Sequence, residues 1–333
     1  MPQIPLWISE AEVVSLVNVP SAIDALERIL PMEARDEARN MKKGVLMVAE
    51  NDAMHVLGAS VTGVGLCGFK TWVNIRGQSS TVVILFSTEN GECQAVIEAT
   101  ALGQTRTAAM TGVGTRRLAP AGADDMAIIG TGKQALPQVA ACAAVLPLRK
   151  LRIYSRSAEN RERLADAVKA QFDLDITLAE TLEEAVRGAP VITLVTNSTQ
   201  PFLTSDMVKP GVHINAMGAI VLARSEFTTD IFPRCSVVAV DNLETIKSIS
   251  SEFRAHYGED DAAWTDVRPM ASLIEDDIRR PDDADLTLFK AMGMGLSDMA
   301  LAVDILAKAR EKGLGHPVPE RIKTPPRLTL RLT

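Results

Sequence analysis

Hydrophobic and polar positions alternate in two different ways along the chain, and this difference divides it into two parts. Two short helical stretches begin near Ser9 and Ser21, and short runs rich in β-branched and aromatic residues then lie between turn residues over about 45–97. Such runs predict an antiparallel sheet. A helix is expected to follow from Thr100 to Leu118.

From Met126 onward, short apolar runs alternate with helical or loop segments. The runs are MAIIG, LRIYS, LDITL, VITLVT, GVHINAMG and SVVAVD. Strands that alternate with helices indicate βαβ units and a parallel sheet. The stretch from Leu286 to Lys312 is predicted to be helical, with breaks at Gly293 and Gly295. We therefore expect an α/β protein in which one domain, residues 118–285, is inserted in an α+β domain made of residues 1–117 and 286–333.

Composition narrows the possible functions. The chain has 333 residues, 47% of them hydrophobic, and a formal net charge of −7, which argues against nucleic acid as its main partner. Its four cysteines and four histidines show no metal-binding spacing, so no metal site is predicted. No basic segment followed by an apolar run opens the chain, and no apolar stretch is long enough to span a membrane. We expect a cytoplasmic protein without a membrane partner.

A glycine-rich turn directly follows the run MAII and opens a helix. It reads Gly130-Thr131-Gly132-Lys133-Gln134-Ala135, which is the GxGxxA form of the dinucleotide-binding fingerprint. Gly130 permits the tight turn, Gly132 lets the backbone approach a pyrophosphate, and Ala135 lets helix and strand pack closely. The inserted domain is therefore predicted to be a Rossmann domain. The alternative is a plain tight turn between strand and helix.

The end of the next predicted strand bears on the choice of cofactor. An acidic residue there would accept hydrogen bonds from the ribose of NAD, but this chain has Ser155, Arg156 and Ser157. An arginine with two hydroxyls suits a ribose 2′-phosphate, which favours NADP(H). Alternatively, Arg156 is solvated and the hydroxyls hold NAD(H).

Two cations stand in surroundings that are unusual for surface residues. Lys70 lies inside an apolar strand, and Arg106 lies among small residues near the start of a helix. A buried lysine is costly unless it is paired or lines a polar pocket. Together these residues could hold a substrate carboxylate, with Arg106 binding it bidentately. For each residue alone, a structural salt bridge is the alternative.

The chain resembles the ornithine cyclodeaminase/mu-crystallin family. The matching stretches are GFKTWVN, QTRTAAMTGVGTRRLA, MAIIGTGKQA, VTNSTQPF, GVHINAMGA and LTLFKAMGMGLSDMALA, in the family's order. The resemblance implies a homodimer in which one lobe forms the dimer and the substrate site while the Rossmann lobe brings the nicotinamide to it. By position, it assigns the substrate carboxylate to Lys70 and Arg106, the pyrophosphate to Gly130, Gly132, Gln134 and Ala135, the cofactor lining to Thr196, Asn197 and Ser198, and the nicotinamide to Met217 and Gly218.

Further residues are candidates for the substrate or cofactor site. Asp298 matches a family position, where it either orients the cofactor pocket or bonds a nearby backbone group. An N-terminal arginine contacts substrate in some members, and Arg39 or Arg35 could be its counterpart. Arg76, near the end of the strand that holds Lys70, could receive a second carboxylate, although a solvated turn arginine is the alternative.

One departure from the family pattern bears on the reaction. Cyclodeaminases carry an aspartate just after the segment that here reads Asn215-Ala216-Met217-Gly218, whereas this chain has Ile220. An isoleucine cannot transfer a proton. We therefore expect NAD(P)H-dependent reduction of a small α-imino acid, including dicarboxylic imines such as iminosuccinate. The alternatives are an ornithine or lysine cyclodeaminase and a protein that binds NADPH and a small ligand without turnover.

Overall fold

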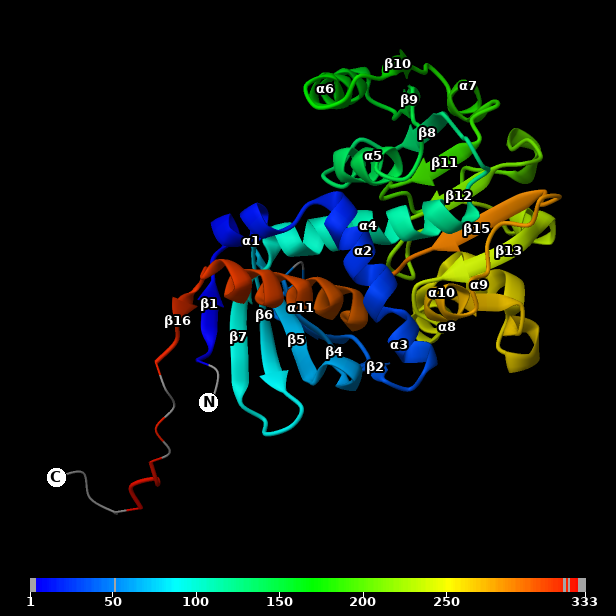
Figure 1. Cartoon of the computed structure of the whole chain (residues 1–333). Helices are drawn as coiled ribbons and strands as arrows, with labels where there is room; N and C mark the ends of the chain where they lie inside the picture. Colours follow the sequence, from blue (N-terminus) through cyan, green and yellow to red (C-terminus); the bar gives the residue numbers. More distant parts are fainter. Residues whose placement is uncertain (1–3, 51, 320–321, 323, 329–333) are drawn as a thin grey trace.

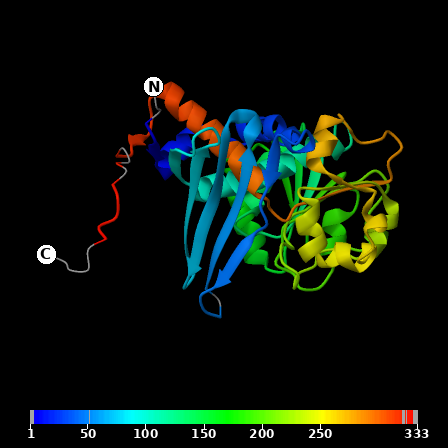
Figure 2. The same cartoon turned by 90° about the horizontal axis from the view of Figure 1, so that it is seen from below.

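The computed structural model describes residues 4–50, 52–319, 322 and 324–328. Two eight-stranded sheets, each with its own helices, form two lobes that lie side by side (Figure 1). The mixed α/β architecture with a parallel sheet confirms the predicted fold class. Residues 324–328 extend away from the first lobe in both views of the ribbon (Figures 1 and 2).

The first sheet is mostly antiparallel and has the order β16-β1-β7-β6-β5-β4-β2, with β3 paired to β4. Its strands are β1 (Leu6–Ile8), β2 (Ala38–Asn40), β3 (Gly44–Met47), β4 (Ala53–Val61), β5 (Leu66–Ile75), β6 (Gln78–Ser87), β7 (Cys93–Glu98) and β16 (His316–Pro317). Alternate residues such as Leu57, Val83 and Leu85 are buried, as expected for strands with one face on a core. Helix α11 (Gly295–Lys312) crosses that face (Figure 1).

The second sheet is parallel throughout and has the order β10-β9-β8-β11-β12-β15-β13-β14. Its strands are β8 (Asp125–Ile129), β9 (Lys150–Tyr154), β10 (Asp175–Leu178), β11 (Val191–Leu194), β12 (His213–Ala216), β13 (Cys235–Val240), β14 (Val267–Pro269) and β15 (Leu286–Lys290). The chain leaves β8 toward β9 on one side and later returns to β11 on the other. A crevice opens at such a reversal beyond the carboxyl ends of the strands, where open α/β sheets bind ligands.

The remaining helices pack beside the sheets. They are α1 (Glu10–Leu16), α2 (Val19–Ile29), α3 (Pro31–Ala34), α4 (Thr100–Leu118), α5 (Ala135–Ala143), α6 (Ala158–Lys169), α7 (Leu182–Val186), α8 (Leu243–Ile249), α9 (Ser251–Tyr257) and α10 (Met270–Glu275). Short 3₁₀ segments cover Thr62–Val64, Ser205–Met207, Thr229–Arg234 and Asp261–Trp264. The bounds of α4 agree with the prediction. This helix joins the lobes, because it packs on α2 and α11 of the first and on α5, β12 and β15 of the second.

The predicted helix over Leu286–Lys312 is wrong in its first part. Leu286–Lys290 is strand β15, whose five residues are all buried and pair with β12 on one side and β13 on the other. A strand covered on both faces has a continuous apolar sequence, which periodicity does not distinguish from a buried helix. The second sheet therefore extends past the boundary that we predicted at residue 285.

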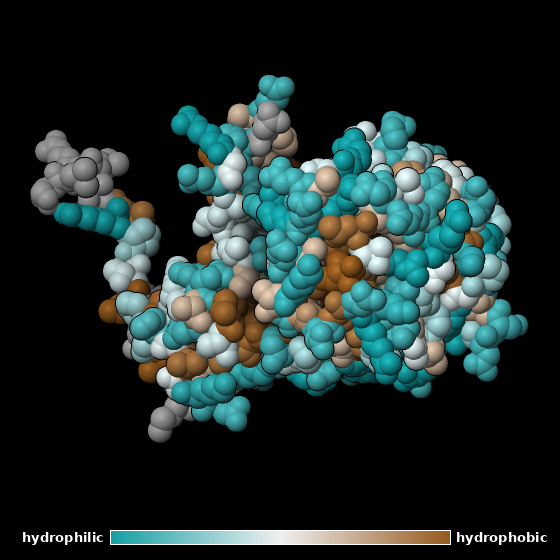
Figure 3. All heavy atoms as spheres, turned by 90° about the horizontal axis from the view of Figure 1, so that it is seen from above, coloured by the Kyte–Doolittle hydropathy of each residue, from teal (hydrophilic) through white to brown (hydrophobic). Residues whose placement is uncertain are grey.

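The surface is that of a globular protein. Polar residues cover most of the face seen in Figure 3, and apolar residues gather on it in a few patches. Within the described ranges, no helix combines the length and the apolar character that a membrane span needs.

Candidate active site

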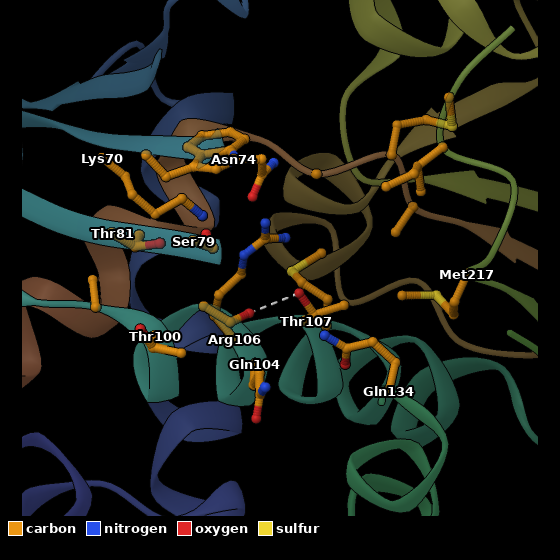
Figure 4. Close-up of a pocket in the computed structure, with 18 residues that line it drawn as sticks. Lys70, Asn74, Ser79, Thr81, Thr100, Gln104, Arg106, Thr107, Gln134 and Met217 are labelled. Carbon is orange, nitrogen blue, oxygen red and sulfur yellow. Dashed lines mark hydrogen bonds between the residues drawn. The ribbon is translucent and has the colours of Figure 1, made fainter. Parts of the chain in front are cut away.

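A cavity of about 320 Å³ lies where the two lobes meet (Figure 4). The first lobe lines it with Lys70 and Trp72 of β5, and α4 contributes Arg106. The second lobe contributes Gln134 and Met217 from the loops that follow β8 and β12. The structure thus brings residues predicted to bind substrate to the same space as residues predicted to bind the cofactor.

Lys70 and Arg106 share a single carboxylate. Asp298, in the first turn of α11, accepts a hydrogen bond from Lys70 Nζ at 2.7 Å and from Arg106 Nε at 2.9 Å, both on Oδ1. Asp298 is fully buried, and its Oδ2 has no hydrogen-bond partner among the described residues. Asp298 therefore holds the two cations together rather than bonding to a cofactor loop. It balances one of their two charges.

The free end of Arg106 faces the cavity. Its Nη1 and Nη2 donate no hydrogen bond to any residue that the structure describes, and Figure 4 shows them directed into the open space beside Asn74. Gly293 makes room for this guanidinium, because a Cβ built at Gly293 would lie 3.3 Å from Arg106 Nη2. Two parallel N–H groups with no protein acceptor suit a carboxylate ligand.

Burial changes the protonation of Lys70. Its pKa is lowered from 10.5 to about 8, because desolvation outweighs the opposing effect of Asp298 and the nearby charge of Arg106 adds to the lowering. Lys70 is only 5% exposed, so its charged form is stabilised mainly by the ion pair with Asp298. An anion bound in the cavity would favour the charged form further.

A third cation, Lys43, was missed by the sequence analysis. Its Nζ lies 5.7 Å from the centroid of the Trp72 ring, and Lys70 Nζ lies 5.0 Å from the same centroid. Burial and the charge of Arg106 lower the pKa of Lys43. In the sequence it sits in the mostly polar stretch Arg39-Asn40-Met41-Lys42-Lys43-Gly44, which is typical of a surface loop.

The other candidate arginines lie elsewhere. Arg76 is exposed in the two-residue turn between β5 and β6, with φ 50°, and Gly77 follows with φ 77°. This is the geometry of a tight hairpin, and Arg76 is not among the residues that line the cavity. Arg39 is 79% exposed on β2, while Arg35 pairs with Glu37 and Glu275. The structure brings none of these arginines to Lys70.

The glycine-rich turn has the geometry that a dinucleotide needs. Gly130 has φ 113°, and a Cβ there would lie 2.5 Å from the carbonyl oxygen of Val195. A Cβ built at Gly132 would meet nothing within 4 Å, so the backbone borders open space ahead of α5. Gln134 Oε1 is buried without a partner among the described residues. Open space at the amino end of a helix fits a bound pyrophosphate, whereas the unpaired Gln134 oxygen is an acceptor and suits a hydroxyl or amide donor.

The other residues predicted to bind the cofactor surround this turn. Ser157 caps α6 by accepting a hydrogen bond from the Asn160 amide, and the Ser155 hydroxyl donates to the Ser157 carbonyl. Arg156 between them is exposed. Thr196, Asn197 and Ser198 follow β11, and Met217 and Gly218 follow β12. Thr131 is half-buried and Lys133 is exposed.

The fold and this cavity define a two-lobed dinucleotide-binding protein with a cationic site between the lobes. The model of the ornithine cyclodeaminase/mu-crystallin family matches residues 6–313. The chain belongs to this family.

Relatives within the family include reductases of imines. The chain is 27% identical to iminosuccinate reductase of Paracoccus denitrificans over 324 residues, which covers 94% of this chain and 99% of the relative. A crystal structure of that enzyme with NAD+ has a TM-score of 0.88 and covers 96% of this chain and 100% of its own. Delta(1)-pyrroline-2-carboxylate reductase of Bacillus cereus is 26% identical over 326 residues, with 94% and 99% covered. Mouse ketimine reductase mu-crystallin is 30% identical over 220 residues, or 66% of each chain.

Proposed function

We propose that the protein is an NAD(P)H-dependent reductase of a small α-imino acid. The observation that carries this proposal is the pair Lys70 and Arg106, which faces the same cavity as Gln134 and Met217. The relatives named above are reductases of imines whose carbon skeleton bears a carboxylate. The cationic side of the cavity would bind that carboxylate, and the imine carbon would then lie toward the second lobe.

The chain's own residues would bind and orient the substrate. Lys70 and the free nitrogens of Arg106 would hold the carboxylate, with Lys43 adding positive charge from the side of Trp72. Two-point binding fixes the direction of the imine carbon, and such orientation supplies up to about 7–11 kcal/mol in favourable cases. The nicotinamide supplies the hydride when it is bound. The imine can take its proton from water before it binds, so this scheme requires no separate acid.

The glycine-rich turn and the neighbouring loops would hold the cofactor. We assign the pyrophosphate to the turn from Gly130 to Ala135 and the ribose to Ser155–Ser157. The exposed Arg156 is free to meet a 2′-phosphate, which would favour NADPH, whereas NADH needs only the neighbouring hydroxyls. Thr196–Ser198 and Met217–Gly218 would flank the nicotinamide half. Asp298 would orient the substrate-binding cations Lys70 and Arg106 rather than the cofactor.

The charge of the cavity also bears on the substrate. Among the residues that line the cavity, Lys70 and Arg106 are cationic and none is a carboxylate, while Asp298 and Asp241 interact with these cations from outside the lining. A lining with cationic side chains alone suits a dicarboxylic imine such as iminosuccinate. Arg76, our sequence-based candidate for a second carboxylate, would have no part in this.

A cyclodeaminase is the less favoured alternative. Ile220 lines the cavity at the position where cyclodeaminases of the family carry an aspartate, and its side chain cannot accept a proton. Turnover of ornithine or lysine to ammonia with catalytic NAD would support this alternative. Tight binding of NADPH without any turnover would support a ligand-binding protein instead.

We also propose that the protein is a homodimer. Lys70 faces Asp298 on α11, so the adjacent Phe69 and its cross-strand partner Ile84 point to the opposite face of the first sheet. Phe69 and Phe86 contact each other there, and both are only half-buried. An apolar sheet face of this kind suits a second copy of the chain. Light scattering should give twice the chain mass, and Phe69→Arg should give the monomer mass.

A substrate panel tests the proposed activity. Purified protein is mixed with NADH or NADPH and with cyclic imines, with keto acids plus ammonia or methylamine, and with oxaloacetate plus ammonia as a source of iminosuccinate. Loss of absorbance at 340 nm with any imino acid supports the proposal. Lys70→Ala should abolish this loss and leave the cofactor dissociation constant nearly unchanged. No reduction across the whole panel, by protein that binds the cofactor, would refute it.

A further inference from the structure

A buried glutamate behind the cavity joins two of the loops assigned above to the cofactor. Glu226 is fully buried, in the segment between β12 and the 3₁₀ turn Thr229–Arg234. Its Oε1 accepts hydrogen bonds from the amide and the hydroxyl of Thr196, at 2.7 and 2.9 Å. Its Oε2 accepts from the amides of Gly218 and Ala219, at 2.8 and 3.1 Å. One carboxylate therefore bridges the loops that follow β11 and β12.

These loops lie so close that little else would fit between them. A Cβ built at Gly218 would lie 2.3 Å from the Thr196 amide nitrogen and 2.4 Å from Glu226 Oε1. The glycine-rich turn packs on the same segment, since a Cβ at Gly130 would come within 3.2 Å of Thr196 Cγ2. The position of Thr196 thus helps to set both the Gly130 turn and the loop that carries Met217 into the cavity.

A buried ion pair, Glu252 and Lys290, contacts the backbone of the Glu226 segment. The amide of Glu226 donates to Glu252 Oε1 at 3.1 Å, and Lys290 Nζ lies 3.7 Å from that oxygen. Lys290, at the end of β15, also donates to the carbonyl of Ala219 at 2.8 Å. All three charged side chains are buried. Such groups are retained at a desolvation cost, and hydrogen bonds to a charged group are among the stronger ones in proteins.

We infer that Glu226 is a positioning residue that fixes the loops bearing Thr196 and Gly218, and through them Met217, against the nicotinamide. This inference rests on the proposed function, since it assigns a task to loops that would hold the cofactor. Glu226 itself does not line the cavity. It acts by setting the position of backbone atoms that do, and displacements on the order of 1 Å at a reacting centre can cost about 100-fold in rate.

Glu226→Gln tests whether the carboxylate fixes the two loops, because glutamine has nearly the same shape as glutamate. A glutamine has one acceptor oxygen and one NH2 group, so one loop loses its acceptor and its amides face a donor instead. Hydrogen exchange should speed up in peptides that cover 195–198 and 217–220, and remain unchanged in β8, β11 and β12. The kcat for imine reduction should fall by roughly tenfold or more, with the KM for the imino acid within about threefold of wild type.

Asp304→Asn is the matched control. It makes the same carboxylate-to-amide change at a buried acid on α11, whose partners Arg28 and Lys308 do not contact the two loops. It should leave the exchange of 195–198 and 217–220 and the kcat much closer to wild type. Equal effects of the two variants would show a general structural role and would overturn the inference.

A second variant keeps the test decisive if Glu226→Gln does not fold. Thr196→Val removes the hydroxyl bond to Oε1 and also the acceptor of the Ser198 amide. The readout is therefore the Thr196 amide, which still donates to Oε1: its exchange should rise while that of 217–220 stays unchanged, and kcat should fall severalfold. Unchanged exchange of the Thr196 amide in a folded variant would overturn the inference. Wild-type protein that reduces no imine would contradict the proposed function but not the exchange result, so the two failures are distinguishable.

Discussion

Binding of a carboxylate should weaken as Lys70 loses its proton. Its pKa of about 8 makes roughly nine-tenths of this lysine charged at pH 7 and roughly one-tenth at pH 9. If only the charged form binds the anion, the dissociation constant rises about tenfold between pH 7 and pH 9 and about another tenfold by pH 10. Each tenfold step is about 1.4 kcal/mol. A surface lysine would give a flat profile over this range.

Pyrrole-2-carboxylate is a suitable probe, because it is planar and keeps a single negative charge from pH 6 to 10. Its dissociation constant would be measured by calorimetry in the presence of NADH. Asp298→Asn should move the midpoint below that of wild type, since the charge of Asp298 and its hydrogen bond both raise the pKa of Lys70. Lys70→Arg should remove the inflection, because a guanidinium stays protonated throughout.

Two results would refute this reasoning. One is a wild-type profile that stays flat to pH 10, which would mean either that Lys70 keeps its proton or that it does not contact the anion. The other is an Asp298→Asn midpoint above the wild-type value, which would mean that the carboxylate does not stabilise the charged lysine. Lys70→Met separates the two causes of a flat profile, because losing the cation weakens binding only if Lys70 contacts the anion.

Three further substitutions have expected outcomes. Lys43→Met should weaken binding of the same probe and raise the midpoint pH, because the charge of Lys43 lowers the pKa of Lys70. Arg156→Ala should raise the KM for NADPH about tenfold and leave that for NADH within about twofold; equal changes would contradict a 2′-phosphate contact. Gly130→Ala should lower the thermal midpoint, because φ 113° and a carbonyl at 2.5 Å exclude a side chain, at a cost on the order of 1–3 kcal/mol. Gly132→Ala is its control: it should preserve the midpoint yet weaken NADH binding, as its Cβ would occupy open space beside the turn.

Local patterns in the sequence were sufficient for much of the fold. Helix α4 begins at Thr100 and ends at Leu118 as predicted, because an uninterrupted run of small and helix-favouring residues has a clear start and end. The turn at Gly130 was found because a strand precedes it and a helix follows. Strand β15 was misread because burial on both faces removes the polar positions that reveal a strand's period of two.

The sequence predicted site residues only where a residue is unusual for its local surroundings. Lys70 in an apolar strand is such a residue, and the structure shows it paired and buried. Lys43 does not stand out, because a lysine in a polar run is ordinary until Trp72, 29 positions later in the chain, is placed beside it. The role of Glu226 was not predicted for the same reason. The four hydrogen bonds to its carboxylate come from three residues, 7–30 positions away on two different loops, and no local pattern records such contacts.

The two glycines at which the sequence predicted breaks explain how Asp298 reaches the two cations. A Cβ built at Gly295 would lie 2.0 Å from the carbonyl oxygen of Gly58, so only glycine lets the first turn of α11 descend onto β4. Asp298 follows one turn later on the same helix, and this close approach carries its carboxylate to Lys70 on the neighbouring strand β5. Gly293 opens the space that Arg106 occupies. The two glycines therefore set the spacing of an ion cluster in which neither has a charge, and a bulkier residue at Gly295 would separate Asp298 from both cations.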